Sequence, residues 1–492
     1  MSLLTLEPVR AGAREALLSA ECVLGETLSK QIRRHHRRRL RRLGWEHALD
    51  GERAGWALGE PRPRPGNAID VLIDGSEALP VIARELEAAR SHVHITGWFC
   101  SPDFALCRGE WPVVLRHLLA ELAERVDVRL LVWAGAPLPL FRPSRREVAR
   151  MRDALTRQSR IKCSLDAKER PLHCHHEKTI VIDDRVAFVG GIDLTTQAGD
   201  RFDTSEHPAR GTIGWHDATT RIEGPAVSDV AEHFRMRWHE VNGEQLAPVA
   251  PCEPVGDVEL QIVRTVPERV YDAVPRGDFR ILESYTSALR SAERFIYLEN
   301  QFLWSPEIAR LLRDKLVDPP HPDFRMLFVL PANPKSGNDD TRGVLAELIE
   351  ADDDAGRLLA CALYARSGPR TDHIYVHAKI AIVDDRWLTL GSANLNEHSL
   401  FNDTEMNVVA HDSALARKTR ERLWAEHLEL TAAEIPDDPV QAIDELWKPI
   451  SKEQLERRSD GLSLTHRLVR LPHVSRRTRR ILGPINSLVV DG

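Results

Sequence analysis

The apolar positions of this chain follow one order of helical and strand spacing twice. In some segments apolar residues recur every three to four positions, and in the segments between them they alternate with polar residues. Each repeat therefore predicts an α/β unit with a mostly parallel central sheet flanked by helices. The first repeat covers residues 76–91, 92–98, 111–125 and 126–133, and the second covers residues 279–293, 294–300, 306–316 and 324–330.

Composition marks where these units begin and end. The sequence PRPRPG at residues 61–66 is a stiff linker signal, and residues 244–258 are proline-rich and irregular. We therefore expect four parts along the chain. They are a basic N-terminal extension and linker at residues 1–65, a first α/β domain at 66–245, a second at 258–432, and a basic C-terminal tail at 433–492.

The overall composition limits the class of protein. Hydrophobic residues make up 42% of the 492 positions, which is enough for a large core. The formal net charge of -7 argues against a protein that coats nucleic acid. The seven cysteines include no CxxC pair, which favours reduced thiols in a cytoplasmic protein over a disulfide framework or a zinc cluster. The sequence predicts neither a signal peptide nor a membrane-spanning segment.

Each repeat leads into the same polar motif, HxKxxxxD. Both copies carry a glycine seven residues after the aspartate, followed by a second small residue and an Asx residue. Two matches with the same offsets, in the same place of a repeated unit, are not expected by chance. The first copy contains His176, Lys178, Asp183, Gly190, Gly191 and Asp193, and the second contains His377, Lys379, Asp384, Gly391, Ser392 and Asn394.

Strand geometry explains this spacing. Residues two apart project from one face of a strand, so each histidine lies beside its lysine. Asp183 and Asp384 lie an odd number of positions away, and we assign them a supporting, orienting role rather than proton transfer. Two such faces form an anion site, in which lysines and Asn394 bind phosphate oxygens, one histidine attacks phosphorus and the other protonates the leaving oxygen. Ser392 and Asp193 are expected to orient this site.

No metal or other cofactor is expected at this pair of motifs. The lysines would repel a cation, and the sequence contains no HExxH motif or carboxylate cluster. A lone histidine is more often structural than catalytic, and we interpret His207 and His321 in that way. Metal binding therefore remains the weaker interpretation of the motif histidines.

The two motifs resemble those of the phospholipase D superfamily, and several segments are similar to the phospholipases D of eukaryotes. The similarity runs, with gaps, from about Val71 to Leu430. It implies two similar α/β domains fused about a pseudo-twofold axis, with the site at their interface. The segments are HHEKTIVIDDRVAFVGGIDL, RFDTSEHP, GWHDATTRIEGPAVSDVAEHFRMRW, YLENQFL, YVHAKIAIVDDRWLTLGSANLNEHSL and LWAEHLEL.

The resemblance also implies roles for individual residues. The histidine of the first motif, His176, is then the nucleophile, and His377 is the general acid that later activates water or an alcohol. Asp217 and Glu405 match family acidic residues that orient the opposite histidines. The chain departs from the family in the sequence NEHSL, where His398 stands in place of the more usual arginine.

These features favour a phospholipase D-type phosphodiesterase. The expected reaction is hydrolysis or transphosphatidylation of glycerophospholipids to phosphatidic acid through a covalent phosphohistidine. A cardiolipin synthase-type phosphatidyltransferase is the first alternative, and a superfamily nuclease or a non-catalytic lipid-binding scaffold follows. We expect a cytoplasmic monomer that contacts the membrane surface peripherally and binds no nucleic acid.

Two basic segments could make that contact. Residues 31–45 contain the densest cluster, and residues 466–482 form a second one. Each is interpreted either as a solvated helix face or as a contact with anionic lipid, at roughly 1 kcal/mol for each basic residue near the surface. The first cluster contains Arg33, Arg34, Arg37, Arg38, Arg39, Arg41 and Arg42.

Overall fold

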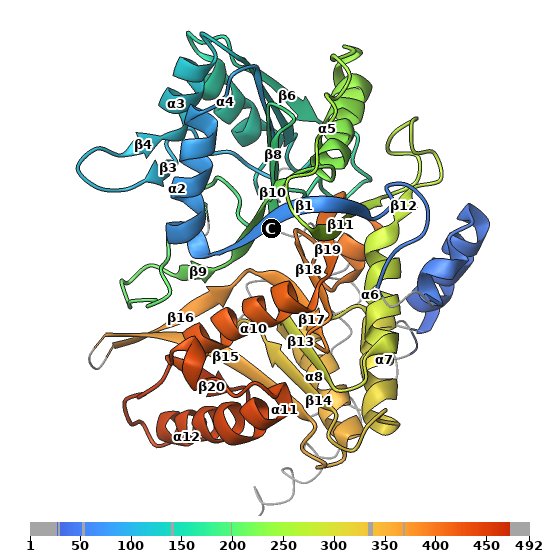
Figure 1. The fold of residues 1–492 in the computed structure, drawn as a ribbon, viewed down its shortest axis with the longest axis vertical. Helices are drawn as coiled ribbons and strands as arrows, with labels where there is room; N and C mark the ends of the chain where they lie inside the picture. The colour runs from blue at the N-terminus through green and yellow to red at the C-terminus, as the bar shows by residue number, and fades with distance from the viewer. Residues whose placement is uncertain are drawn as a thin grey trace, which may run out of the picture.

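Each half of the chain builds a sheet with the same order of strands. The computed structural model describes residues 27, 30–51, 55–138, 142–197, 199–332, 338–367 and 370–472. The first sheet runs β1-β10-β8-β7-β2-β5-β6, and the second runs β11-β19-β18-β17-β13-β14-β15-β20. The duplication in the sequence is therefore a duplication of topology, visible as two lobes in Figure 1.

The strands of the first half are β1 (Arg64–Ile73), β2 (His92–Gly97), β5 (Asp127–Trp133), β6 (Lys162–Asp166), β7 (Thr179–Ile182), β8 (Val186–Gly190) and β10 (Ala218–Glu223). Those of the second half are β11 (Val258–Val266), β13 (Phe295–Asn300), β14 (Arg325–Val329), β15 (Leu358–Ser367), β17 (Lys379–Val383), β18 (Trp387–Gly391), β19 (Glu405–His411) and β20 (Leu468–Arg470). Shorter or outlying strands are β3 (Ala105–Cys107), β4 (Val113–Val114), β9 (Gly214–His216), β12 (Asp278–Phe279) and β16 (Arg370–Val376).

The expectation of a mostly parallel sheet is wrong, because both sheets are mixed. Only β2-β5-β6 and β13-β14-β15 are parallel, and the other neighbours in the two sheets run antiparallel. The reason lies in the order of motif and turn, which is the same in both halves. In each half the strand that follows the motif histidine folds back on the next strand as a hairpin, β7–β8 or β17–β18. Two successive aspartates with positive φ, such as Asp183 (56°) and Asp184 (55°), form the turn.

Helices cover both sheets. The helices of the first half are α2 (Asp74–Glu87), α3 (Leu115–Leu122), α4 (Arg145–Thr156) and α5 (Val227–Asn242). Those of the second half are α6 (Arg280–Ser291), α7 (Pro306–Val317), α8 (Asn338–Asp352), α9 (Glu397–Phe401), α10 (Ser413–Leu428), α11 (Pro439–Ala442) and α12 (Lys448–Ser459). Short 3-10 turns span Glu46–Leu49 and Ala432–Glu434, and a π-helical turn spans Ile443–Trp447.

The two halves share a hydrophobic core. One buried cluster combines Val181 and Val189 of the first sheet and Val230 of α5 with Ile262 and Val408 of the second sheet. Strands β1 and β11 also pair directly, so the two sheets are hydrogen-bonded to each other. Burial of apolar surface across this junction fixes how the halves face one another.

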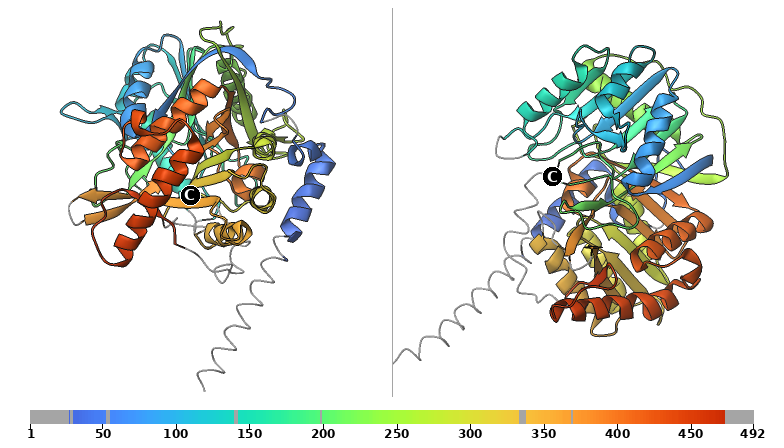
Figure 2. Two further views of the ribbon diagram at one scale, coloured as in Figure 1. Left: turned by 60° about the horizontal axis from the view of Figure 1, so that its bottom comes forward. Right: turned by 90° about the vertical axis from the view of Figure 1, so that its left-hand side faces the viewer.

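The basic N-terminal segment packs against the second half. Residues 30–43 form a helix that lies beside α6 and α7 (Figures 1 and 2). Arg39 is buried and donates to Glu268 at 2.9 Å and to the amide oxygen of Asn402 at 2.9 Å. Arg37 donates to Glu307 at 3.1 Å, and His36 stacks on Phe401. Part of the basic cluster therefore anchors the helix rather than facing solvent.

The C-terminal region is also part of the fold as far as the structure describes it. Helices α11 and α12 are followed by β20, which pairs with β15 at the edge of the second sheet. Most of the second basic segment, residues 473–482, lies outside the described residues. No helix in the described part of the chain combines the length and apolar character that crossing a bilayer requires.

The docked N-terminal helix leads to a test of stability. Replacing Arg39 with Ala leaves Glu268 buried with only Arg170 as a charged partner, at 3.3 Å. We expect a loss of roughly 3 kcal/mol, because removing one partner of a buried ion pair leaves the other charge with less compensation than its burial requires. The exposed Arg38 forms no ion pair or side-chain hydrogen bond with the described residues, so Arg38→Ala should stay within about 0.5 kcal/mol of wild type. Thermal and denaturant unfolding measure both, and equal stability of the two variants would show that the helix is not anchored in this way.

Candidate active site

The two motif histidines lie where strands of one half meet a segment of the other. The backbone N–H of His176 donates to the carbonyl of Thr404 at 2.9 Å, and that of His377 donates to the carbonyl of His216 at 2.8 Å. The parallel pairing of β9 with β16 supports the second contact. Each motif is thus held at the junction by the backbone of the opposite half.

Two carboxylates cross the junction to bind the histidines. Nδ1 of His176 lies 2.9 Å from Oε1 of Glu405, and Nδ1 of His377 lies 2.6 Å from Oδ2 of Asp217. A carboxylate acceptor favours the proton on Nδ1, which leaves Nε2 of each ring for chemistry. The hydroxyl of Ser399 donates to Glu405 at 2.6 Å, and that of Ser392 donates to it as well.

The two lysines turn back toward their own histidines. Nζ of Lys178 donates to the carbonyl of His176 at 2.6 Å and lies 3.6 Å from Oδ2 of Asp193. Nζ of Lys379 donates to the carbonyl of His377 and, at 3.0 Å, to the side-chain oxygen of Gln301. The site therefore brings two ammonium groups beside two imidazoles.

Two amide side chains, those of Asn394 and Gln301, also lie in the site. The amide nitrogen of Asn394 donates to the side-chain oxygen of Gln301 at 3.2 Å, so Gln301 joins Asn394 to Lys379. Asn394, Ser392 and Asp193, the Asx and small residues of the two motifs, are all buried here.

Burial and positive charge set the protonation of the site. Burial, followed by the charges of Lys379 and Lys178, holds the pKa of His377 well below its ordinary value. Burial raises the pKa of Asp217 to about 6 and that of Glu405 to about 8. Each carboxyl group binds a proton more readily than usual, so it can hold the proton that it shares with its histidine. The lysines then supply positive charge for an anion.

The aspartates of the two motifs lie elsewhere. Asp183 accepts the backbone N–H groups of Arg90, Ser91 and His92 at 2.7–3.0 Å, beyond the far end of β7. Asp384 accepts those of residues 293–295 at 2.7–2.8 Å in the same way. Each lies seven positions after its histidine, along a largely extended segment that spans roughly 20 Å. These carboxylates fix the loop before β2 or β13 and do not orient the reacting groups.

Sequence reasoning did not single out three residues that complete the site. They are Gln301, Ser399 and Arg201, although all three fall within or beside the segments that resemble the superfamily. The guanidinium of Arg201 lies 3.4 Å from the centre of the Trp215 ring, and burial lowers its pKa to about 10. The positive charge of Arg201 contributes to lowering the pKa of His377, so Arg201 is a third cation of the site. Only their location in those segments could have identified these residues from the sequence, because single polar residues form no spacing pattern.

This duplicated fold, with two histidine-lysine motifs at one junction, has the arrangement that the sequence resemblance to the phospholipase D superfamily implies. The chain belongs to the phospholipase D superfamily. A family model described as "Cardiolipin synthase, PLD-like domain" matches residues 349–426.

Curated relatives show the same similarity. Phospholipase D A of Dictyostelium discoideum is 27% identical over 74% of this chain and 36% of its own length. Phospholipase D1 of Schizosaccharomyces pombe is 24% identical over 75% of this chain and 36% of its own. The major cardiolipin synthase ClsA of Bacillus subtilis is 22% identical over 72% of this chain and 67% of its own. The chain thus spans about a third of the length of the first two relatives.

A solved structure is also similar. The crystal structure of phosphatidylserine synthase from Haemophilus influenzae aligns with a TM-score of 0.48 at 13% identity, covering 80% of this chain and 93% of that one.

The position of Asp183 leads to a prediction on stability and pH. Burial alone would raise the pKa of Asp183, but the backbone N–H groups of His92, Ser91 and Arg90 lower it below the ordinary value. The stabilisation is therefore full above about pH 4 and is lost as the pH falls through the lowered pKa. Asp183→Asn should cost about 1.5–3 kcal/mol at pH 7, and the gap to wild type should shrink below about pH 4.

The matched control is Asp257→Asn, since Asp257 is exposed and its side chain forms no ion pair or hydrogen bond with the described residues. It should unfold like wild type at both pH values. A gap for Asp183→Asn that persists unchanged at acidic pH would contradict the assignment of the ionised carboxylate as the stabilising form.

Proposed function

We propose that the protein is a phospholipase D-type phosphodiesterase that hydrolyses or transphosphatidylates glycerophospholipids through a covalent phosphohistidine. One observation carries the proposal: two imidazoles at one junction, each with Nδ1 bound by a carboxylate of the opposite half and each beside a lysine. This arrangement supplies a nucleophile, an acid and a cationic phosphate site.

In the first step Nε2 of His176 attacks phosphorus. A phosphorus–nitrogen bond forms as the bond to the headgroup oxygen breaks, and Nε2 of His377 donates a proton to that oxygen. In the second step His377 takes a proton from water or an alcohol, whose oxygen attacks phosphorus and releases His176. Lys178 and Lys379 stabilise the non-bridging oxygens throughout.

The negative charge of the substrate favours protonation of His377, the general acid. Without a bound anion, burial and the lysine charges hold the pKa of His377 low, which favours its neutral form. A phosphodiester between Lys178 and Lys379 offsets their charge and removes part of that effect. His377 thereby gains its proton when the substrate is in place, and Asp217 stabilises the imidazolium.

A cardiolipin synthase-type phosphatidyltransferase is the second candidate. The family model that matches residues 349–426 and the similarity to the Bacillus subtilis enzyme favour it. The two candidates share the first chemical step and differ in the acceptor of the second. Mass spectrometry of products from mixed phospholipids, with and without added alcohol or phosphatidylglycerol, separates them.

The covalent step can be tested by substitution. His176→Ala should lower turnover of a soluble short-chain phospholipid by at least about 10³-fold and abolish acid-labile phospholabelling of the protein. His377→Ala should lower turnover similarly, yet still allow slow labelling by a substrate with a good leaving group. The measurements are steady-state kinetics and intact-protein mass spectrometry of quenched reactions.

The control is His94→Gln, which changes a buried histidine that stacks on Phe234 away from the junction. It should keep its turnover per folded molecule. Labelling that survives in His176→Ala but disappears in His377→Ala would reverse the two assignments, and full activity in His176→Ala would refute the mechanism.

We also propose that the exposed arginines of the N-terminal helix contact anionic lipid. Arg39 is excluded from that role by burial, and Arg33 and Arg37 are paired with Glu307. The exposed members of the cluster are Arg34, Arg38, Arg41 and Arg42, of which Arg41 forms a solvent-exposed ion pair with Glu46.

Replacing these four exposed arginines with Gln should weaken binding to anionic vesicles, by about 1 kcal/mol for each charge that lies near the surface. Turnover of a soluble substrate should not change. High salt should mimic the substitution, since the Debye length is about 3 Å at 1 M. Vesicle co-sedimentation measures the effect.

Four exposed arginines on and after α4 offer a control with the same change of charge. They are Arg146, Arg150, Arg157 and Arg160. If their replacement weakens vesicle binding as much as that of the N-terminal set, the effect is one of net charge, and the N-terminal helix is not the contact.

A further inference from the structure

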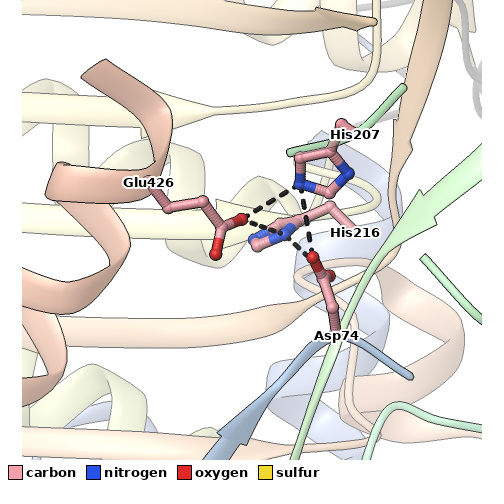
Figure 3. A group of neighbouring side chains, drawn as sticks. All are labelled: Asp74, His207, His216 and Glu426. Carbon is pink, nitrogen blue, oxygen red and sulfur yellow. Dashed lines mark hydrogen bonds and ion pairs between the residues drawn. The ribbon is translucent and has the colours of Figure 1, made fainter. Parts of the chain in front are cut away.

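A second polar cluster lies beside the reacting histidines but outside them. It contains Asp74 at the start of α2, His207 in the loop before β9, His216 at the end of β9 and Glu426 on α10 (Figure 3). Asp74, His207 and His216 are buried, and the side chain of Glu426 is 7% exposed. Three of the residues come from the first half and one from the second.

The four side chains converge on one point. Nε2 of His207 lies 3.0 Å from Oε1 of Glu426 and 3.3 Å from Oδ2 of Asp74. Nδ1 of His216 lies 3.3 Å from the same Glu426 oxygen and 3.1 Å from Oδ1 of Asp74. Ligand atoms about 2.0–2.1 Å from a tetrahedral Zn²⁺ are about 3.3 Å apart. With Oδ2 as the ligand atom of Asp74, the separations from His207 to Glu426, from His216 to Glu426 and from His207 to Asp74 are 3.0–3.3 Å, close to that spacing.

The outer nitrogen of each histidine is bound by another carboxylate. Nδ1 of His207 lies 3.0 Å from Asp203, and Nε2 of His216 lies 2.8 Å from Glu299. If each outer nitrogen carries the proton, the inner nitrogens present lone pairs to the centre of the cluster. Carboxylate–histidine–metal arrangements have this form, because the outer acceptor fixes the tautomer of the ligand.

Charge balance allows two states of the cluster. Asp74 and Glu426 bring two negative charges that burial leaves without solvent. They are neutralised either by two protons, one on each histidine, or by one divalent cation between two neutral histidines. In the first state the inner contacts are N–H···O interactions. Among the described residues, however, Oδ2 of Asp74 is approached by Nε2 of His207 at 3.3 Å without the geometry of a hydrogen bond. A buried oxygen that faces the centre without a well-directed donor fits a metal ligand.

The backbone also converges on this point under strain. Asp74 has φ of 59° and His207 has φ of 43°, conformations that cost free energy for residues other than glycine. Such conformations persist where contacts of the side chain with its surroundings offset this free energy. Both strained residues direct their side chains into the cluster (Figure 3).

We propose that Asp74, His207, His216 and Glu426 bind one Zn²⁺ ion, as a structural site distinct from the reacting histidines. The ion joins the first half to α10 of the second. It also fixes Asp217, since Oδ1 of Asp74 accepts the backbone N–H of Asp217 at 3.1 Å, and the backbone N–H of Asp74 donates to the carbonyl of Asp217 at 2.8 Å. The site thereby positions the carboxylate that binds His377.

Metal analysis of the full chain tests the proposal without reference to activity. Protein purified from zinc-supplemented medium, and desalted, should contain one zinc per chain by inductively coupled plasma mass spectrometry. Protein reconstituted with Co²⁺ should show the visible absorption bands of a tetrahedral N/O site. Absence of bound metal in both preparations overturns the proposal and leaves the cluster as a network of ion pairs.

Variants locate the ion. Glu426→Gln and His207→Gln should lower metal content at least about tenfold, and Asp203→Asn should weaken zinc affinity by about 10–100-fold through the outer contact to His207. His94→Gln and His173→Gln serve as controls, the latter because His173 belongs to another His/Asp cluster with His398 and Asp403. Both should keep their zinc.

Loss of zinc in His173→Gln together with retention in Glu426→Gln would place the ion in the other cluster and refute the assignment. If Glu426→Gln fails to fold, the Asp203→Asn affinity and the Co²⁺ spectrum of the wild type still decide. Since metal content is the readout, an inactive enzyme with one zinc would refute the proposed function and leave this site standing.

Discussion

The structure depends on two hydrogen-bonded pairs that cross between the halves of the chain. Glu405 of the second half binds His176 of the first, and Asp217 of the first half binds His377 of the second. Each pair is buried, so either partner alone would leave a polar group without solvent or acceptor. Neither half alone can therefore provide both the histidine and the carboxyl group of a pair, and the junction is at once a folding interface and the candidate active site.

The rest of the fold serves to hold these pairs in register. In both halves the motif histidine precedes a hairpin strand, and the aspartate at the hairpin turn accepts three backbone N–H groups of the loop before the neighbouring strand. That contact fixes one end of the strand while the backbone of the opposite half fixes the other. The aspartate of each motif thus positions the strand, and it lies seven residues along the chain from the motif histidine.

Sequence reasoning reached those features that repeat or alternate. The duplication, the pairing of each histidine with its lysine and the opposite placement of the aspartates all follow from periodicity. The mixed sheet was not predicted. The alternation of helices and strands favoured parallel sheets, although the Asp-Asp turns are typical of hairpins, whose strands run antiparallel. Asp217 and Glu405 came from resemblance, since no local pattern connects residue 217 with residue 377. His207, interpreted from sequence as an isolated structural histidine, gains its neighbours only when the chain folds.

The docked N-terminal helix has a consequence for how the chain is made. Arg39 reaches Asn402, which lies 363 residues later. At roughly 5–20 residues per second, a ribosome completes this helix about 20–70 s before it completes the surface that receives the helix. Leu40 is fully buried in the finished protein, in a hydrophobic cluster that includes Leu400 and Phe401, so its environment is incomplete during that interval. The first described helix to emerge is thus among the last to find its place.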